Sequence, residues 1–301
     1  ESKRVKTKMG DSIVKLSIAS DTNVIDKRKT SQSVCPNFIH SLDAAVLQLA
    51  VVKAKEACSG SRPVAKAFID HYKLQSGDKI LDIGCGWGGM AFEIARQSQC
   101  EVKGISLSEN QVDYCNKKVK ELKLDNQVHF ELCDYRKVKG NFQRIVSVGA
   151  FEHFGKKFYK TFFKTINNIM TEDGICLLHT IGSVDSPRTV QPFIQKRIFP
   201  GGILPSLSDL ISPIEKTGLI LADCETLIHH YDKTLKAWLD RFLKNKEKAK
   251  FLYNKEFVRM WEFYLASCSA GFKFRDLVVY QLQLVKSFTA LPSNRRNYIY
   301  Q

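Results

Sequence analysis

The sequence lacks the cysteine pairs that mark a metal centre or a disulfide framework. Its nine cysteines include no Cys-x-x-Cys pair, and no two histidines have the spacing of a zinc site. This pattern predicts reduced thiols in a cytosol-like compartment and no bound metal. No apolar run reaches the ~18 residues needed to cross a bilayer, and the first residues are charged rather than signal-like. Any contact with a membrane is therefore expected to be peripheral.

Acidic residues are scarce relative to basic ones. The chain contains 31 Asp and Glu against 46 Lys and Arg, which gives a formal charge of +15 at pH 7. Such a charge attracts anionic partners, whether nucleic acid, anionic lipid or phosphorylated substrates, and does not choose between them. With 301 residues, 44% of them hydrophobic, the chain is long enough for one large domain or two modest ones with a real core.

Composition divides the chain into three parts. Residues 1–57 form a polar, basic N-terminal segment with a strand-like run at residues 12–18 and a predicted helix from Pro36 onward. Residues 58–63, "CSGSRP", have the composition of a linker. Residues 64–301 are expected to form the main domain.

The main domain alternates between strand-like and helix-like segments, which is typical of a parallel sheet covered on both faces. We therefore predict an α/β fold, a doubly wound sheet with helical insertions. Residues 183–222, rich in Pro, Gly and Ser, are expected to be a long insertion over the open end of the sheet. Strands are expected at residues 78–84, 100–108, 128–134, 142–151, 173–182 and 275–288, and helices at residues 64–74, 88–98, 109–124, 159–170 and 233–271.

A glycine-rich turn, "LDIGCGWGG", follows the first of these strands and opens a helix. Gly84, Gly86 and Gly88 allow the backbone to bend and approach a ligand closely, while free N–H groups at the helix start face it. A dinucleotide-binding fold would carry an acid at the end of the second strand. That strand ends "GISLSENQ", and the acid, Asp82, precedes the first glycine instead. A tight turn without a ligand is the alternative.

Eight motifs occur in order along residues 63–288: "ILDIGCGWGG", "GISLSENQ", "CDYR", "RIVSVGAFEHFG", "LLHTIG", "IFPGGILPS", "HHYDKTLKAW" and "YLASCSAGFKFRD". Together they resemble the cyclopropane-fatty-acid synthases, which include the mycolic acid cyclopropane synthases. The resemblance implies the Rossmann-like fold of methyltransferases that use S-adenosylmethionine (SAM), with SAM as cosubstrate. The implied SAM site consists of Gly84, Cys85 and Gly86 against the methionine part, Ser106, Leu107 and Gln111 against the ribose and adenosine, Asp134 and Tyr135 beside the adenine, and Asp82.

The reaction of that family transfers a methyl group from SAM to a cis double bond of a phospholipid acyl chain and closes a ring. Its carbocation requires a dry site and a base for one methyl proton, and the family uses a bound bicarbonate as that base. Without the family match, Glu152 could belong to a solvated loop, His179 could be a core histidine and Tyr231 a packing residue. By matching motifs, the resemblance implies that the catalytic residues that would hold bicarbonate here are Glu152, His179, the backbone of Ile181, Tyr231 and Cys268.

Two groups of aromatic residues have both a structural and a functional interpretation. Residues 241–265, "RFLKNKEKAKFLYNKEFVRMWEFYL", mix Lys and Arg with aromatic side chains and suit an anionic membrane surface. A solvated face with a buried aromatic side is the alternative. The membrane interpretation predicts a cytoplasmic protein that associates peripherally with a membrane. The second group fits a wall for the acyl chain, although such stripes are usually core, and consists of Phe151, Phe154, Phe158, Phe162 and Phe163.

The N-terminal part departs from the family. Full-length members carry a His-Tyr-Asp-x-Gly-Asn motif and a Tyr-Ser-Cys motif, which close over SAM and help to hold bicarbonate, and neither occurs here. Residues 3–54 instead resemble a C-terminal piece of single-subunit, phage-type RNA polymerases around "PNFIHSLDA". The His-Asp-Ser-Phe-Gly stretch that carries a catalytic aspartate in those polymerases is absent. We therefore interpret residues 1–57 as a joined fragment in which His40 and Asp43 are inert.

Three other functions stay open at this level. One is C- or N-methylation on the same scaffold, because some small-amine N-methyltransferases share "FEH"-type motifs. Another is nucleic-acid binding or modification, suggested by the charge and by residues 1–57. The end of the fourth strand, "GAFE", lacks the Asn/Asp-Pro-Pro-Tyr typical of amino-group methylation of bases. The third is an inactive remnant, because the missing cap leaves the site open to water. A homodimer also stays open.

Overall fold

The computed structural model describes residues 2–9, 12–19, 72, 74–185 and 190–290, the first two ranges by their backbone only. The helix predicted from Pro36, the linker, and both His40 and Asp43 lie outside the described residues. The same holds for most of the helix predicted at residues 64–74.

The N-terminal segment contains a two-stranded antiparallel hairpin. β1 (Ser2–Met9) pairs with β2 (Ser12–Ala19), so that Val5 lies opposite Leu16. The strand-like run at residues 12–18 is confirmed as β2. The sequence analysis does not predict β1, because Lys and Arg occupy half of its positions and lower its strand propensity.

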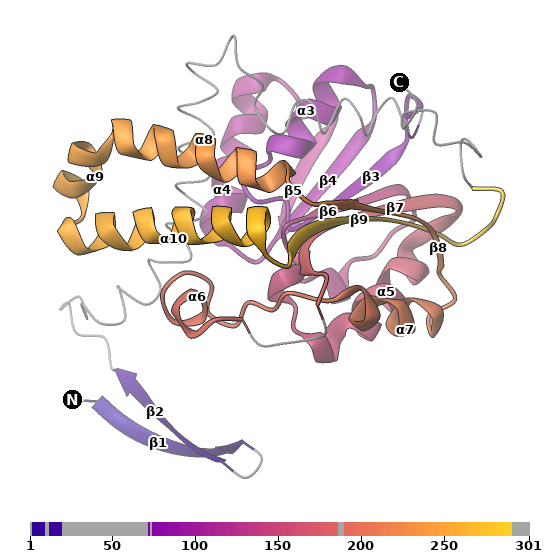
Figure 1. Cartoon of the computed structure of the whole chain (residues 1–301). Helices are drawn as coiled ribbons and strands as arrows, with labels where there is room; N and C mark the ends of the chain where they lie inside the picture. The colour runs from indigo at the N-terminus through magenta and orange to yellow at the C-terminus, as the bar shows by residue number, and fades with distance from the viewer. Residues whose placement is uncertain (1, 10–11, 20–71, 73, 186–189, 291–301) are drawn as a thin grey trace.

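A seven-stranded sheet forms the centre of the main domain, in the order β5-β4-β3-β6-β7-β9-β8 (Figure 1). β9 (Leu277–Val285) runs antiparallel between β7 and β8 (Ile220–Leu227). From β3 the sheet continues on one side through β4 and β5 and on the other side through β6 and β7. The carboxyl ends of β3 and β6 therefore flank the crevice in which open α/β sheets bind ligands. The parallel strands are β3 (Lys79–Ile83), β4 (Glu101–Ser106), β5 (Val128–Leu132), β6 (Phe142–Val148) and β7 (Met170–Ser183).

Helices cover both faces of the sheet, which confirms the doubly wound fold (Figure 1). α3 (Gly89–Gln97) and α4 (Glu109–Leu122) lie on one face. α5 (Tyr159–Ile169) and α7 (Leu207–Glu215) lie on the other. α4 begins after Ser108, whose side chain accepts a 3.4 Å hydrogen bond from the Gln111 amide and so caps the helix.

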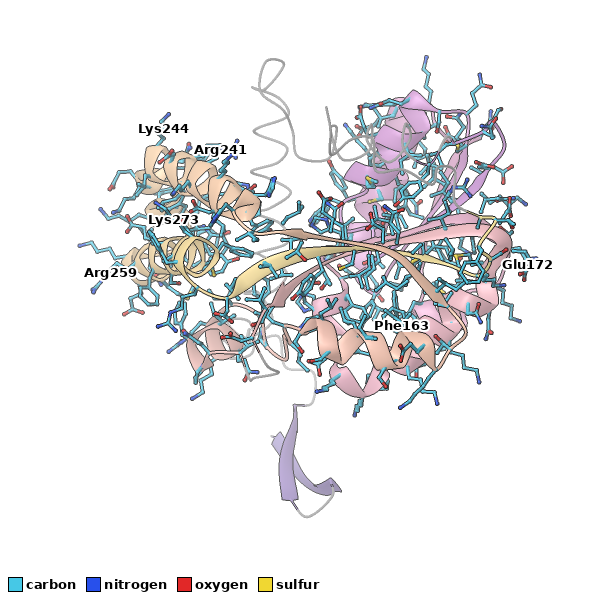
Figure 2. The ribbon with its side chains drawn as sticks, turned by 45° about the vertical axis from the view of Figure 1, so that its right-hand side comes forward. Phe163, Glu172, Arg241, Lys244, Arg259 and Lys273 are labelled. Carbon is cyan, nitrogen blue, oxygen red and sulfur yellow. The ribbon has the colours of Figure 1, made fainter. Side chains whose placement is uncertain are left out.

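The aromatic residues around α5 belong to the core. Phe151, Phe162 and Phe163 are fully buried, and their ring centroids lie 5.1–5.8 Å apart. Figure 2 shows Phe163 on the α5 side of the sheet. For these three residues the core interpretation is confirmed, and they are not available as a wall for an acyl chain. Their burial anchors the segment that follows β6, which carries the candidate site.

Residues 183–222 cross the open end of the sheet only in part. The loop after α6 (Pro192–Arg197) passes the carboxyl edge, where the Ile203 amide donates to the Glu152 carbonyl at 2.8 Å. Among the described residues that follow this loop, residues 207–215 form α7, which packs with α5, and residues 220–222 begin β8. The sequence analysis misses β8 because Asp223 and Glu225 interrupt its apolar pattern. As an edge strand, β8 is only half-buried and tolerates these residues.

A helical hairpin projects from the sheet and confirms the helices predicted at residues 233–271 (Figure 1). It consists of α8 (His230–Lys244), α9 (Lys246–Leu252) and α10 (Lys255–Phe274). Its inner face is apolar and includes Phe242 and Trp261. Among the residues that the structure describes, none of the helices has the length and apolarity that a bilayer crossing requires.

Candidate active site

The carboxyl ends of β6 and β7 bring two predicted site residues together. Val148 pairs with His179 in the parallel register, and the Gly149 amide donates to the His179 carbonyl at 3.0 Å. The short 3₁₀ helix η2 (Phe151–His153) then turns at this edge and carries Glu152. The pairing of two parallel strands thus places Glu152 beside the end of β7.

The Glu152 carboxylate is buried and is bound through one of its two oxygens. Oε1 accepts a 2.6 Å hydrogen bond from the Ile181 amide, whereas Oε2 has no hydrogen-bond partner among the described residues. Burial raises the pKa of Glu152 to about 6, and the hydrogen bond from Ile181 opposes this shift. Because an unpartnered buried oxygen is costly, Oε2 is suited to a ligand that donates a hydrogen bond.

His179 is oriented by a residue from the neighbouring strand. It lies opposite Gln281 of β9, and the Gln281 Nε2 is 3.2 Å from the His179 Nδ1. When the Gln281 NH₂ group donates in this contact, Nδ1 accepts and the ring proton lies on Nε2. Burial lowers the pKa of His179 to about 4. At pH 7 the ring is therefore neutral and has one N–H group to donate.

Tyr231 and Cys268 come from the helical hairpin. Tyr231 lies in the first turn of α8 and Cys268 in the last part of α10, and both pack in the apolar cluster that includes Ile181. The rings of Tyr231 and Phe272 are 5.0 Å apart. Burial raises the pKa of Cys268 to about 12, so this residue is a neutral thiol at pH 7. Packing thus brings both residues toward Ile181, whose amide binds Glu152.

The three glycines of the turn after β3 serve different purposes. All have a positive φ, between +54° and +79°. A Cβ at Gly84 would collide with Ala150, and a Cβ at Gly88 would lie 2.8 Å from Phe130. A Cβ at Gly86 would meet no described atom within 4 Å. Gly84 and Gly88 therefore make room for the protein itself, and Gly86 leaves the backbone open to a ligand.

Two amides of this turn are already engaged. Gly84 and Cys85 both donate to the Ile105 carbonyl of β4, at 3.0 and 3.1 Å. These two N–H groups are therefore not free for a ligand, whereas the free N–H groups predicted at the start of the helix belong to α3 and stay a prediction. Burial also raises the pKa of the Cys85 thiol, which stays neutral. These hydrogen bonds fix the turn against β4 and set the position of Gly86.

Three apolar side chains are exposed where neighbouring strands end. Leu107 follows β4, Leu132 ends β5 and Val148 ends β6, and their exposed fractions are 74%, 48% and 37%. All three lie at the carboxyl edge, on either side of the glycine turn. We call these three side chains the apolar shelf; they lie at the edge where open α/β sheets bind ligands, and they offer apolar contact there.

The other predicted cofactor residues flank this shelf. Ser106 and Gln111 are buried, and the Ser106 hydroxyl donates to the Gln111 side chain at 2.7 Å. The Asp134 carboxylate accepts hydrogen bonds from the Arg136 guanidinium and backbone, which lower its pKa. Tyr135 is largely buried because its ring stacks in the aromatic core. The structure thus brings these residues to one edge, with Tyr135 mostly inside the protein.

Asp82 is a buried acid on β3, two residues before Gly84. Its Oδ2 has no hydrogen-bond partner among the described residues, and burial raises its pKa to about 7. An ionised carboxylate here is unfavourable unless a cation approaches it. Asp82, the open backbone at Gly86 and the apolar shelf therefore fit a ligand that combines positive charge with a flat apolar ring.

Sequence reasoning missed two residues of the site. Gly149 has a φ of +69°, and a Cβ there would meet no described atom within 4 Å. A glycine directly after a buried strand is a signal that could have identified it. Gln281 gave no such signal, because only the pairing of β7 with β9 places it opposite His179.

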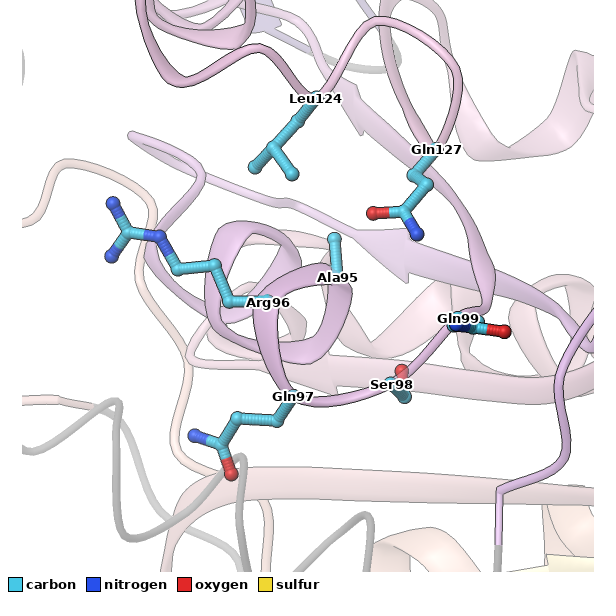
Figure 3. Close-up of a pocket in the computed structure, with 7 residues that line it drawn as sticks. All are labelled: Ala95, Arg96, Gln97, Ser98, Gln99, Leu124 and Gln127. Carbon is cyan, nitrogen blue, oxygen red and sulfur yellow. The ribbon is translucent and has the colours of Figure 1, made fainter.

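An open depression of about 600 Å³ lies elsewhere on the sheet (Figure 3). Its residues end α3 or precede β4 and β5, so it lies at the amino edge, opposite the candidate site. It is lined by Ala95, Arg96, Gln97, Ser98, Gln99, Leu124 and Gln127.

The fold and the site define a class, the methyltransferases that use SAM. Haemonchus contortus phosphoethanolamine N-methyltransferase 2, solved with SAM, matches with a TM-score of 0.69 at 17% identity, over 91% of this chain and 62% of that one. At this identity the likeness shows the fold alone. The family is shown by the model for mycolic acid cyclopropane synthetase, which matches residues 61–282, and the chain belongs to that family. A DNA-dependent RNA polymerase model matches residues 1–60.

Individual relatives agree with this assignment. The cyclopropane-fatty-acyl-phospholipid synthase of Escherichia coli K12 is 37% identical over 224 residues, which are 74% of this chain and 57% of that protein. The chain therefore spans little more than half the length of this relative. The solved cyclopropane synthase MmaA2 from Mycobacterium tuberculosis matches with a TM-score of 0.69 at 30% identity, over 76% of this chain and 86% of that one. The related CmaA1, 28% identical with a TM-score of 0.69, was solved with SAH and CTAB; the match covers 77% of this chain and 87% of that one.

Proposed function

We propose that residues 64–301 catalyse SAM-dependent methylene transfer to the cis double bond of unsaturated phospholipid acyl chains. Family membership and the similarity to the synthases support this function. The observation that carries it is the buried Glu152 carboxylate, with one oxygen held by the Ile181 amide and the other without a hydrogen-bond partner in the described part of the chain. The polymerase-like residues 1–57 and the linker at residues 58–63 take no part in the chemistry in this proposal.

The SAM site in this proposal is the carboxyl edge around the glycine turn. When bound, SAM supplies an electrophilic methyl group. The buried Asp82 suits its positive charge, the backbone at Gly86 lets its methionine part approach, and Leu107 offers an apolar surface to its ring. The remaining proposed contacts are Gly84, Cys85, Ser106, Gln111, Asp134 and Tyr135.

Bicarbonate is proposed as the proton acceptor, held between η2, β7 and the helical hairpin. Glu152 Oε2 accepts the bicarbonate hydroxyl, and the Nε2–H of His179 donates to one of its other oxygens. The Ile181 amide acts by orienting Glu152, and Tyr231 and Cys268 close the site from the hairpin. The apolar cluster around these two residues excludes water, which a carbocation requires.

A lipid substrate implies that the protein works at a membrane surface. We propose a peripheral, cytoplasmic contact with anionic lipid, supported by the charge of +15.

The mass of the product tests the function. Incubation with methyl-labelled SAM, bicarbonate and unsaturated phospholipid should add one CH₂ to the fatty acids and remove their double bond. A methylated amine instead would assign N-methylation, and labelled fatty acid that keeps a double bond would assign C-methylation without ring closure.

A further inference from the structure

The far end of the helical hairpin carries large apolar side chains in water. We define the α9 tip as residues 246–255, which connect α8 to α10. Phe251 and Leu252 are consecutive in this tip, and they are 88% and 60% exposed. Tyr253 follows and is also exposed. The inner face of the hairpin is already filled, so these side chains do not serve its packing.

Basic side chains surround the α9 tip. Residues 241–259 contain seven Lys and Arg against two Glu. Two of the cations form ion pairs within the hairpin, Lys246 with Glu262 and Lys250 with Glu247. The cations that are exposed and make no ion pair with any described residue are Lys244, Lys248, Lys255 and Arg259.

All four of these cations are exposed. Figure 2 shows two of them, Lys244 and Arg259, on the outer sides of α8 and α10. The tip therefore presents apolar side chains within a rim of positive charge. This combination is typical of elements that lie in a membrane interface.

We propose that the α9 tip docks on an anionic phospholipid bilayer, with Phe251 and Leu252 inserted among the headgroups and the lysines at the phosphates. The inference rests on the proposed function, because it names the surface from which the acyl substrate is drawn. Nucleic acid would use the cations but leave both apolar side chains in water. A second copy of the chain would bring two positive surfaces together, which is unfavourable.

The tip is remote from the candidate site, so it can be altered separately. α8 has 15 residues and is roughly 22 Å long at 1.5 Å per residue. Tyr231 lies at the start of that helix, and the tip lies beyond its end. Docking through the tip attaches the hairpin, and with it the domain that carries the site, to the bilayer.

Cosedimentation of the full chain with vesicles tests the proposal. The wild type should bind phosphatidylcholine–phosphatidylglycerol vesicles at least about tenfold more tightly than pure phosphatidylcholine vesicles, and salt should reduce the difference. The double variant Phe251→Ser/Leu252→Ser should bind the anionic vesicles about tenfold more weakly or worse. Phe288→Ser is the matched control, because Phe288 is 85% exposed beyond the end of β9, and it should bind as the wild type does.

Two further measurements separate this proposal from the proposed function. The double variant should bind SAM with wild-type affinity in calorimetry and should convert detergent-dispersed phospholipid at the wild-type rate. A wild-type chain that binds anionic vesicles through its tip but yields no product would contradict the function and support the docking surface.

Several results would overturn the docking surface. The wild type could fail to bind anionic vesicles, or the double variant could bind them as tightly as the wild type does. Phe288→Ser could also reduce vesicle binding as much as the double variant does. Tip-dependent binding to duplex DNA, or a tip-dependent dimer, would also overturn it if vesicle binding were absent.

Discussion

The Ser269 hydroxyl donates a 2.5 Å hydrogen bond to the Asp232 carboxylate and so joins α10 to α8. Ser269 follows Cys268, and Asp232 follows Tyr231, so one buried contact fixes both hairpin residues of the candidate site. Lys236 binds the other oxygen of Asp232 at 2.7 Å. The base of the hairpin is therefore held by a specific polar contact as well as by apolar packing.

Ser269→Ala should loosen this contact. Removing a buried hydrogen bond to a charged group should lower the Tm by roughly 3 °C or more, and methylene transfer should fall while the affinity for SAM is kept. Ser267→Ala is the control on the same helix, because the hydrogen bond from its hydroxyl to the Tyr264 carbonyl stays within α10. Equal effects of the two substitutions on the Tm and on activity would show that the contact between the helices has no special role.

Glu152→Gln should change the pH dependence of stability. A carboxyl group whose pKa is raised from 4.5 to about 6 in the folded state stabilises the fold fully below pH 4.5, and this contribution is lost as the pH rises through 6. The variant should therefore be more stable than the wild type by about 2 kcal/mol at pH 8 and by less than half of that at pH 5. Urea denaturation at both pH values measures the difference. Glu172→Gln, at an exposed carboxylate (Figure 2), should show no such gain, and a pH-independent effect of Glu152→Gln would contradict the burial argument.

Alanine at Gly84 should mainly lower the stability of the fold, whereas alanine at Gly86 should mainly lower the affinity for SAM. Gly84→Ala should destabilise the fold by about 3 kcal/mol or more, because strain at a positive φ adds to the collision with Ala150. Gly86→Ala should cost only about 1 kcal/mol of strain but weaken SAM binding at least tenfold. Thermal unfolding and calorimetry give the two quantities. If Gly86→Ala bound SAM as the wild type does, the ligand would not approach this glycine.

SAM binding should release a proton from Asp82. With a pKa of about 7 this group is about half protonated at pH 7, and a bound cation should lower that pKa. Calorimetry in buffers with different ionisation enthalpies should give about half a proton released at pH 7. Asp82→Asn should remove this release. A release that is the same in both proteins would assign the proton to another group.

Most strands of the fold can be predicted from the sequence pattern, whereas β1 and the edge strand β8 cannot. Each parallel strand contains a short apolar run or an alternation of apolar and polar residues, and turns or helix-like segments follow it, so β3 to β7 can be located from the sequence alone. β1 and β8 escape this criterion because charged residues interrupt them. Pairing determines that they are strands: β1 pairs with the adjacent β2, and β8 pairs with β9, which lies much later in the chain.

The sequence predicts only the part of the site that one pair of neighbouring strands positions. Parallel pairing of β6 with β7 places Glu152 near His179, as expected for residues at neighbouring strand ends. Gln281 and the hairpin residues approach through long-range packing, which no local pattern records. The resemblance to a family supplied the roles of Tyr231 and Cys268, and the structure supplied the engaged amides of Gly84 and Cys85.

The central claim is that Glu152 supports methylene transfer without serving to bind SAM. The most direct test measures both quantities for the wild type and for Glu152→Gln, using unsaturated phospholipid and bicarbonate. We predict that kcat falls by about 10²-fold or more while the Kd for SAM changes by less than about twofold. A variant that retains the wild-type kcat would contradict the account, because the unpaired oxygen of Glu152 would then have no part in the reaction.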